Sequence, residues 1–188
     1  MKSILLATQN ESKIKLLTKL ITDVCGEFKF INLKELGIED EVLETGTIEE
    51  RAKDKAQFYL QKAMKIGHEF DYVLGSDDGI EIPGIILPTA ETKKIVSQII
   101  NQNLIQSEQE VNILRAFCFI SKFGRKELVT KIPLKYIGDE QIAKITGKYP
   151  LSFLLSHIDK NQAIADNLPE KITIYNLKYS SELRNLEL

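Results

Sequence analysis

The sequence lacks a cysteine framework and any long apolar run, and each absence removes a class of protein. Cys25 and Cys118 are the only cysteines, too few and too far apart for a zinc knuckle or a set of disulfides. No apolar run approaches the roughly 20 residues that span a bilayer. The N-terminus has no charged-then-apolar leader with a small-residue cleavage site. We therefore expect a cytoplasmic protein that has free thiols and no membrane partner.

An excess of basic charge is also missing, since 25 basic residues face 27 acidic ones for a net charge of −2. A chain with this balance offers no basic surface for nucleic acid, although a local pocket for a phosphate group is still allowed. The motifs Gly-x-x-x-x-Gly-Lys-Ser/Thr and Gly-x-Ser-x-Gly are absent as well. Their absence disfavours a P-loop enzyme and a serine hydrolase.

What the chain does contain is a regular succession of apolar patterns along its 188 residues, 43% of which are hydrophobic. This length favours one domain, 1–188, with a substantial buried core. Strand and helix patterns alternate in the first half and a long hairpin follows, which predicts an α/β or α+β sheet with a lobe that carries the hairpin. The expected strands are 3–7, 28–33, 72–74, 111–123 and 127–137, and the expected helices are 14–24, 48–66, 89–103 and 171–188.

The first strand-to-helix turn carries polar groups that could meet a ligand. An apolar run at Ser3–Ala7 precedes it, and Asn10 or Ser12 could cap the helix that follows. Lys13 and Lys15 then lie in the first helical turn, where a cation opposes the positive end of the helix dipole. A bound anion would turn this mismatch into an advantage, because free backbone N–H groups and a lysine would converge on it. The alternative is an ordinary junction with two solvated lysines.

Three carboxylates form a second candidate site. Asp77 and Asp78 leave the apolar strand 72–74, and Glu44 lies in an acidic loop before the second long helix. Adjacent carboxylates are costly to hold together unless a positive group accompanies them. A hard cation such as Mg²⁺ would do so, using carboxylate oxygens and keeping waters for a phosphate partner. The alternative is that Asp77–Gly79 is only a turn, since Asp and Gly are turn formers.

Taken in order, these pieces resemble the inosine/xanthosine triphosphate pyrophosphatase family, which clears noncanonical purine nucleoside triphosphates. The resemblance covers the N-terminal half, and several short motifs in sequence are more specific than any one of them. The matching segments are Thr8-Gln-Asn10-Glu-Ser-Lys13, Glu44-Thr45-Gly46, Thr47-Ile-Glu-Glu50-Arg-Ala52 with Lys55-Ala56, and Ser76-Asp77-Asp78-Gly79-Ile80 with Pro83-Gly84-Ile85.

The resemblance implies a fold and a reaction. The fold is α/β, two-lobed, with a mixed twisted sheet flanked by helices and a long hairpin in the second lobe, usually assembled as a homodimer. The reaction is the Mg²⁺-dependent hydrolysis of a nucleoside triphosphate between its α- and β-phosphates. Its products are a nucleoside monophosphate and pyrophosphate.

The resemblance also implies roles for residues that bind the triphosphate. Thr8, Asn10 and Lys13 would cradle the phosphates from the first turn. Lys55 would reach them from the second helix, and Lys171 corresponds to a late lysine of the family. Lysines in these places would neutralise the charge that develops on the phosphates.

The carboxylates receive the remaining roles. Glu44 would help to hold Mg²⁺, and Asp77 falls on the catalytic aspartate, which activates the attacking water and lies close to the metal. Asp78, assigned to substrate binding, stands where a small hydroxyl residue is usual. A one-residue gap in the match would instead make Asp78 the base, so both registers stay open at this point.

The C-terminal half departs from the family pattern. The segment that borders the base is reduced to Gly147-Lys148-Tyr149-Pro150 and has no aspartate. The Ser-His-Arg motif that reads the purine ring falls on Tyr175-Asn176-Leu177. Because a site built to hydrogen-bond a base loses most of its discrimination without those donors, we expect altered or relaxed base recognition. The alternative is a catalytically impaired homologue that binds a nucleotide or a partner protein.

Overall fold

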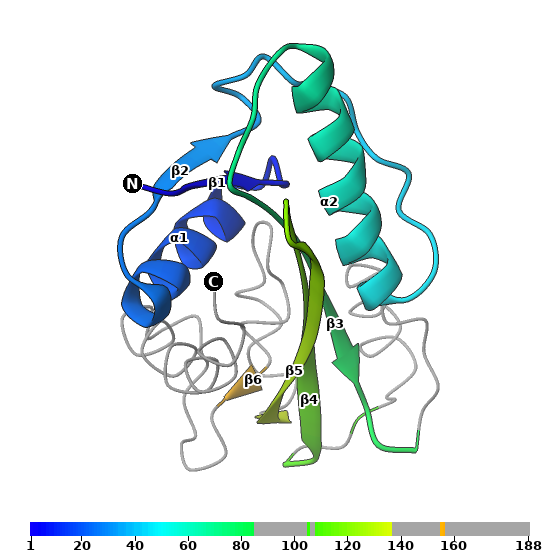
Figure 1. Ribbon diagram of the computed structural model, residues 1–188. Helices are drawn as coiled ribbons and strands as arrows, with labels where there is room; N and C mark the ends of the chain where they lie inside the picture. The colour runs from blue at the N-terminus through cyan, green and yellow to red at the C-terminus, as the bar shows by residue number, and fades with distance from the viewer. Residues whose placement is uncertain (85–104, 106–107, 137–154, 157–188) are drawn as a thin grey trace. The chain divides into compact units, whose positions relative to one another are not determined.

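The computed structural model describes residues 1–84, 105, 108–136 and 155–156 (Figure 1). The chain divides into two compact units, and each is described separately. Among the described residues, the first unit holds Met1–Asp77 and Arg115–Thr130, and the second holds 78–84, 105, 108–114, 131–136 and 155–156. The expected helices at 89–103 and 171–188, the base-binding segments and Lys171 lie outside the described residues.

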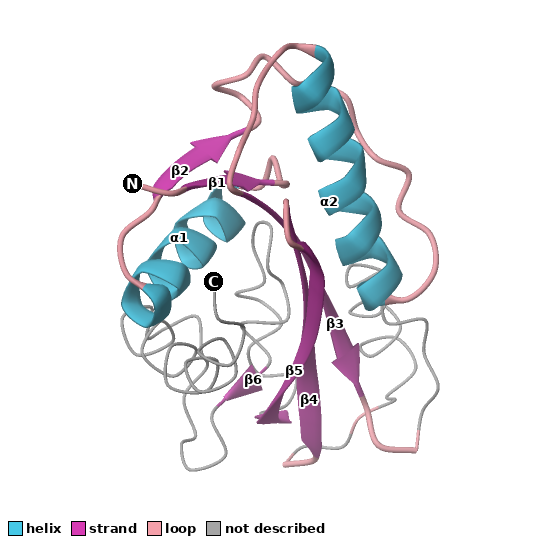
Figure 2. Cartoon of the chain, viewed as in Figure 1, coloured by secondary structure: helices cyan, strands magenta, loops and turns pink. Residues whose placement is uncertain are grey.

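The strands form a mixed sheet in the order β2-β1-β3-β4-β5-β6 (Figure 2). β1 pairs in parallel with β2 on one side and with β3 on the other, whereas β5 and β6 are antiparallel. Parallel and antiparallel pairs therefore coexist, which confirms the mixed sheet that the family resemblance implies. The strands are β1 (Ser3–Leu6), β2 (Lys29–Asn32), β3 (Tyr72–Glu81), β4 (Glu110–Ser121), β5 (Gly124–Tyr136) and β6 (Leu155–Ser156).

The first strand and helix form as their patterns predict. Ile4–Ala7 is fully buried, because a parallel strand with a neighbour on each side is covered on both faces. Helix α1 (Glu11–Cys25) begins three residues before the expected start at Ile14. Its N-cap is Asn10, whose side chain accepts hydrogen bonds from the backbone N–H groups of Ser12 and Lys13. The structure thus chooses Asn10 over Ser12 as the cap.

Helix α2 (Ile48–Lys65) also starts where its sequence predicts. The Thr47 side chain accepts from the backbone N–H of Glu50, and the Glu50 carboxylate accepts from the backbone N–H of Thr47, which completes the expected capping box. Small side chains, Ala52 and Ala56, lie on the buried face of the helix. Within the described residues, no helix is long and apolar enough to cross a membrane.

Strand β3 differs from the prediction in length. It runs without a break from Tyr72 to Glu81, so the short strand 72–74 and the interpretation of Asp77–Gly79 as a turn are both wrong. The turn-forming residues stay extended because the strand is enclosed: Ser76 is 1% exposed and Asp77 is 7% exposed. Side chains alternate along a strand, so Asp77 and Asp78 point to opposite faces.

A long hairpin joins β4 to β5, as expected, and its loop is Lys122–Phe123 rather than the predicted Gly124-Arg125. Two-residue loops are the commonest hairpin connections. Residues Arg115–Thr130 of the hairpin belong to the first unit, and its outer ends belong to the second. The hairpin predicted for the second lobe therefore contributes to both units.

Gly75 explains how closely β3 approaches α2. A Cβ atom at Gly75 would lie 2.0 Å from the backbone oxygen of Ala52 and 2.8 Å from the backbone nitrogen of Ala56. Only glycine leaves room for this contact, because real side chains do not tolerate such distances. The approach brings the polar face of α2 beside Ser76 and Asp77.

We predict that Gly75→Ala lowers the free energy of unfolding by about 1–3 kcal/mol, the usual cost of an overpacked core. Urea unfolding measures the change. Adding Ala56→Gly should not restore stability, because the closest clashing atoms belong to the backbone of α2. A Gly75→Ala protein as stable as the wild type, or full rescue by Ala56→Gly, contradicts the proposed close approach.

Candidate functional site

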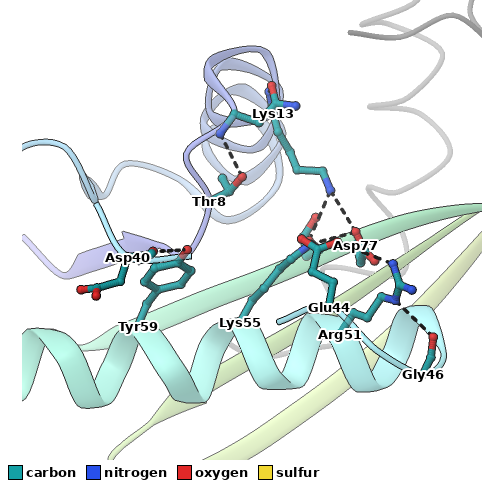
Figure 3. Close-up of polar contacts among 11 residues, drawn as sticks. Thr8, Lys13, Asp40, Glu44, Gly46, Arg51, Lys55, Tyr59 and Asp77 are labelled. Atoms are coloured by element: carbon teal, nitrogen blue, oxygen red, sulfur yellow. Dashed lines mark hydrogen bonds and ion pairs between the residues drawn. The ribbon is translucent and has the colours of Figure 1, made fainter. Parts of the chain in front are cut away.

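Asp77 lies at the centre of a group of charged residues in the first unit (Figure 3). The pairing of β1 with β3 ends at Leu6 and Leu74, so Asp77 follows three residues beyond the carboxyl end of that ladder. Its Oδ1 accepts a hydrogen bond from Lys55 Nζ at 3.0 Å and lies 3.7 Å from Lys13 Nζ. Its Oδ2 is buried and has no hydrogen-bond partner. Oδ1 of this carboxylate is thus bound by two lysines, whereas Oδ2 could still accept a hydrogen bond or bind a cation.

Lys13 enters the site from the first turn of α1. Its side chain extends to β3, where Nζ donates to the backbone oxygen of Ser76 at 3.3 Å. Lys15, two residues on, is exposed to solvent. The sequence offered both lysines as candidates for an anion site or as solvated residues, and the structure separates them: Lys13 is buried beside Asp77, and Lys15 is a surface residue.

The expected anion site at the N-terminus of α1 is partly occupied by the chain itself. Asn10 Oδ1 takes the N–H groups of Ser12 and Lys13, and Thr8 Oγ1 accepts from the backbone N–H of Asn10 at 3.2 Å. The side chains of Thr8 and Asn10 therefore already bind these N–H groups. The groups are not the free donors that the predicted anion site requires. Thr8 and Asn10 stabilise the turn that carries Lys13 into the site.

Lys55 joins the two carboxylates. Its Nζ lies 2.7 Å from Glu44 Oε1 and 3.0 Å from Asp77 Oδ1 (Figure 3). Burial by itself would lower the pKa of Lys55, but the charges and hydrogen bonds of Asp77 and Glu44 outweigh it and raise the pKa above the ordinary 10.5. Lys55 is therefore a fixed positive charge at neutral pH, and it makes the proximity of two acids tolerable.

Glu44 is held from its other side by Arg51. The Nη1 atom of Arg51 lies 3.6 Å from Glu44 Oε2, and its Nε donates to the backbone oxygen of Gly46 at 3.2 Å. The Arg51 side chain is 10% exposed, whereas that of Glu44 is 43% exposed. A buried guanidinium thus fixes a carboxylate that remains open to solvent.

The acidic loop is attached to α2 along one face of the helix. Figure 1 shows the connection from β2 to α2 running beside α2, and residues at helical spacing contact it. Tyr59 donates to the backbone oxygen of Asp40 at 3.0 Å, and Lys62 Nζ lies 2.9 Å from Asp40 Oδ2. Together with Arg51 and Lys55, they form a polar stripe. Arg51 and Lys55 hold the loop at Glu44, whereas Tyr59 and Lys62 hold it at Asp40.

Sequence reasoning did not single out Arg51, Tyr59 or Lys62 as site residues. Tyr59 is buried, as an aromatic residue on a helix usually is, but its hydroxyl also donates to the loop at Asp40. The available signal was the spacing of Arg51, Lys55, Tyr59 and Lys62, which repeats at one helical face behind a loop rich in acids. Of the predicted residues, the structure brings Lys13, Glu44, Lys55 and Asp77 together.

The donor set is compatible with a hard divalent cation. No group of three or more His, Cys, Asp or Glu side chains that could hold a metal lies within the described part of the chain. Mg²⁺ needs no such cage, because it is commonly bound by one or two carboxylates together with substrate phosphates and water. Glu44 and Asp77 supply two carboxylates that share one lysine, and Asp77 Oδ2 is an orphaned buried oxygen. These residues fit the cation expected from the sequence.

Solved structures resemble the chain, whereas no protein-family model and no curated protein matches it. A nucleoside-triphosphatase / dITP/XTP pyrophosphatase from Mycobacterium abscessus matches with a TM-score of 0.58 and 18% identity, over 96% of this chain and 97% of that one. The Ham1 protein of Staphylococcus aureus matches with a TM-score of 0.56 and 16% identity, over 87% of this chain and 85% of its own. The chain has an ITPase-like α/β fold. The resemblance seen in the sequence is thus confirmed at the level of the fold.

Within this ITPase-like fold, we predict that Lys55→Met lowers the free energy of unfolding by about 1–3 kcal/mol, because the buried Asp77 loses its hydrogen-bond donor and keeps only the longer contact with Lys13. Since the pKa of Lys55 is raised by folding, its contribution is complete below pH 10.5 and is lost as the pH rises through the folded-state pKa. Urea unfolding at several pH values tests both statements. Lys15→Met is the control and should change stability by less than about 0.5 kcal/mol. Equal stability of the two variants contradicts the burial of the Lys55–Asp77 pair.

Proposed function

We propose that the chain is a Mg²⁺-dependent nucleoside triphosphate pyrophosphatase. It hydrolyses the bond between the α- and β-phosphates and releases a nucleoside monophosphate and pyrophosphate. Its base recognition is altered or relaxed. We further propose that it acts as a single domain of 188 residues, as a homodimer, in the cytoplasm and without a nucleic-acid or membrane partner.

The observation that carries this proposal is the state of the Asp77 carboxylate. Two lysines hold its Oδ1, and its buried Oδ2 has no hydrogen-bond partner. A buried polar atom without a partner carries a cost that a purely structural carboxylate would avoid. An incoming water or cation removes that cost. This favours a reactive role for Asp77 over a structural one.

The roles of the surrounding residues follow from their chemistry. Asp77 Oδ2 accepts a hydrogen bond from the attacking water and takes its proton, which makes it the general base. Lys13 and Lys55 are released from Asp77 toward the phosphates, where their charges offset the negative charge that develops. Thr8 and Asn10 hold the turn that carries Lys13 and lie beside the same phosphates.

Glu44 and Asp77 would hold the divalent cation. When bound, the cation supplies charge neutralisation on the phosphate oxygens and polarises the bond that is broken. Lys171 completes the proposed substrate-binding residues, whereas the Asp78 side chain points away from this group and is left out of it. Asp78 lies on the opposite face of β3 from Asp77, which favours Asp77 as the base over the alternative register.

The substrate class comes from the likeness to the Mycobacterium abscessus protein, whose name specifies dITP and XTP. In this chain the base-reading Ser-His-Arg motif is replaced by Tyr175-Asn176-Leu177. Loss of those donors weakens discrimination between purines, because the penalty for an unpaired base edge disappears. We therefore propose a noncanonical purine triphosphate as substrate, with weaker selectivity than the family shows.

We predict that the purified protein releases pyrophosphate from at least one of ITP, XTP, dITP and the standard triphosphates when Mg²⁺ is present. Chelation of the metal should abolish turnover, because the phosphate charge is then unscreened. Pyrophosphate and monophosphate are measured together to show where the chain of phosphates is cut. No turnover on the whole panel rejects the enzyme. Nucleotide binding by calorimetry without product formation then supports the alternative, a catalytically impaired homologue.

We predict that Asp77→Asn lowers kcat by at least about 100-fold, the lower end of what a general base contributes. Asp78→Asn, the matched change on the other face of the strand, should cause a much smaller loss. Thermal melting of both variants checks that each is folded. A larger loss for Asp78→Asn than for Asp77→Asn would show that the alternative register is the correct one.

A further inference from the structure

Glu44 forms ion pairs with two basic side chains, Arg51 and Lys55. Arg51 Nη1 approaches Oε2 at 3.6 Å, and Lys55 Nζ approaches Oε1 at 2.7 Å. Arg51 also donates from Nε to the backbone oxygen of Gly46. One guanidinium therefore holds both the carboxylate and the main chain two residues further along. Arginine can make both contacts because its planar guanidinium carries several N–H groups in a fixed arrangement. The single ammonium group of a lysine cannot make both.

The two cations differ in what else they bind. Lys55 is shared with Asp77, so its contact with Glu44 is one of two competing for the same ammonium group. Arg51 instead bonds the loop backbone, which a ligand does not displace. If a divalent cation were bound, Glu44 would hold it through Oε1 in place of Lys55, and Arg51 would keep its contact with Oε2. Glu44 would then bind the cation as a monodentate ligand, through one oxygen only.

Single-oxygen presentation suits the proposed metal. Mg²⁺ demands a near-octahedral shell, keeps several waters and uses few carboxylate oxygens. The side chain of Glu44 is 43% exposed, so its free rotation in solvent would otherwise cost affinity. Mutation of a residue that hydrogen-bonds or pairs with a metal ligand, without touching the metal, commonly weakens metal affinity about 10- to 100-fold.

We propose that Arg51 is a positioning residue that holds one oxygen of Glu44 and thereby presents the other to the divalent cation. This inference rests on the proposed function, since it concerns the same metal. Arg51 itself does not contact the cation or the substrate. Its effect is therefore expected in metal affinity rather than in the chemistry of the bond that breaks.

The test measures Mn²⁺ binding to the intact protein without nucleotide, from the electron paramagnetic resonance signal of free Mn²⁺. Arg51→Met should weaken binding by about 10- to 100-fold. Arg51→Lys keeps the charge but loses the planar guanidinium, so it should fall between Arg51→Met and the wild type. Lys62→Met is the matched control: it removes the same charge from the same helix and breaks a contact with the same loop at Asp40. It should stay within about twofold of the wild type.

The outcomes separate this inference from the proposed function. Arg51→Met can fold, because Glu44 is exposed enough to regain water, and thermal melting checks this. Unchanged Mn²⁺ affinity in Arg51→Met, or equal weakening in Lys62→Met, overturns the positioning role alone. A wild-type protein that binds no Mn²⁺ overturns the metal site of the proposed function and this inference with it. Selective weakening with partial rescue by Arg51→Lys supports it.

Discussion

The structure of the site depends on one ammonium group placed between two acids. Lys55 lies within 3.0 Å of carboxylate oxygens on both Glu44 and Asp77, and without it the buried Asp77 carboxylate and the more exposed Glu44 carboxylate would repel each other. The same arrangement would allow a divalent cation to bind between the two acids. Because Lys55 is shared, either acid can exchange its contact with Lys55 for a divalent cation without being left unpaired. A phosphate chain would accept the released lysine.

Several local features converge on that placement. Gly75 admits the backbone of α2, which sets Lys55 beside β3. The Asn10 cap fixes the first turn of α1, from which Lys13 reaches Ser76. The polar stripe on α2 holds the acidic loop that contains Glu44. Each feature fixes a segment that carries a charged side chain of the site, and this is how a site is preorganised for charge.

Much of this arrangement could be predicted from the sequence. Capping signals and apolar spacing located α1 and α2, and the family resemblance brought Lys13, Glu44, Lys55 and Asp77 into one hypothesis. The length of β3 could not be predicted, because Gly-Ser-Asp-Asp-Gly is a turn composition and only distant partners keep it extended. Arg51 was also missed, since its importance comes from contacts with a loop whose path no pattern reveals. The local conformational preferences of residues can be predicted from the sequence. The tertiary contacts that override those preferences cannot.

The central claim is that Glu44 and Asp77 form one cation and phosphate site with Lys13 and Lys55. A crystal grown with Mn²⁺ and inorganic tripolyphosphate tests it most directly, through the anomalous signal of manganese. The account predicts a manganese peak in coordination distance of Glu44 and Asp77, with phosphate oxygens contacted by both lysines. A manganese peak elsewhere, with Lys55 still bridging the two acids and no phosphate beside them, would contradict it.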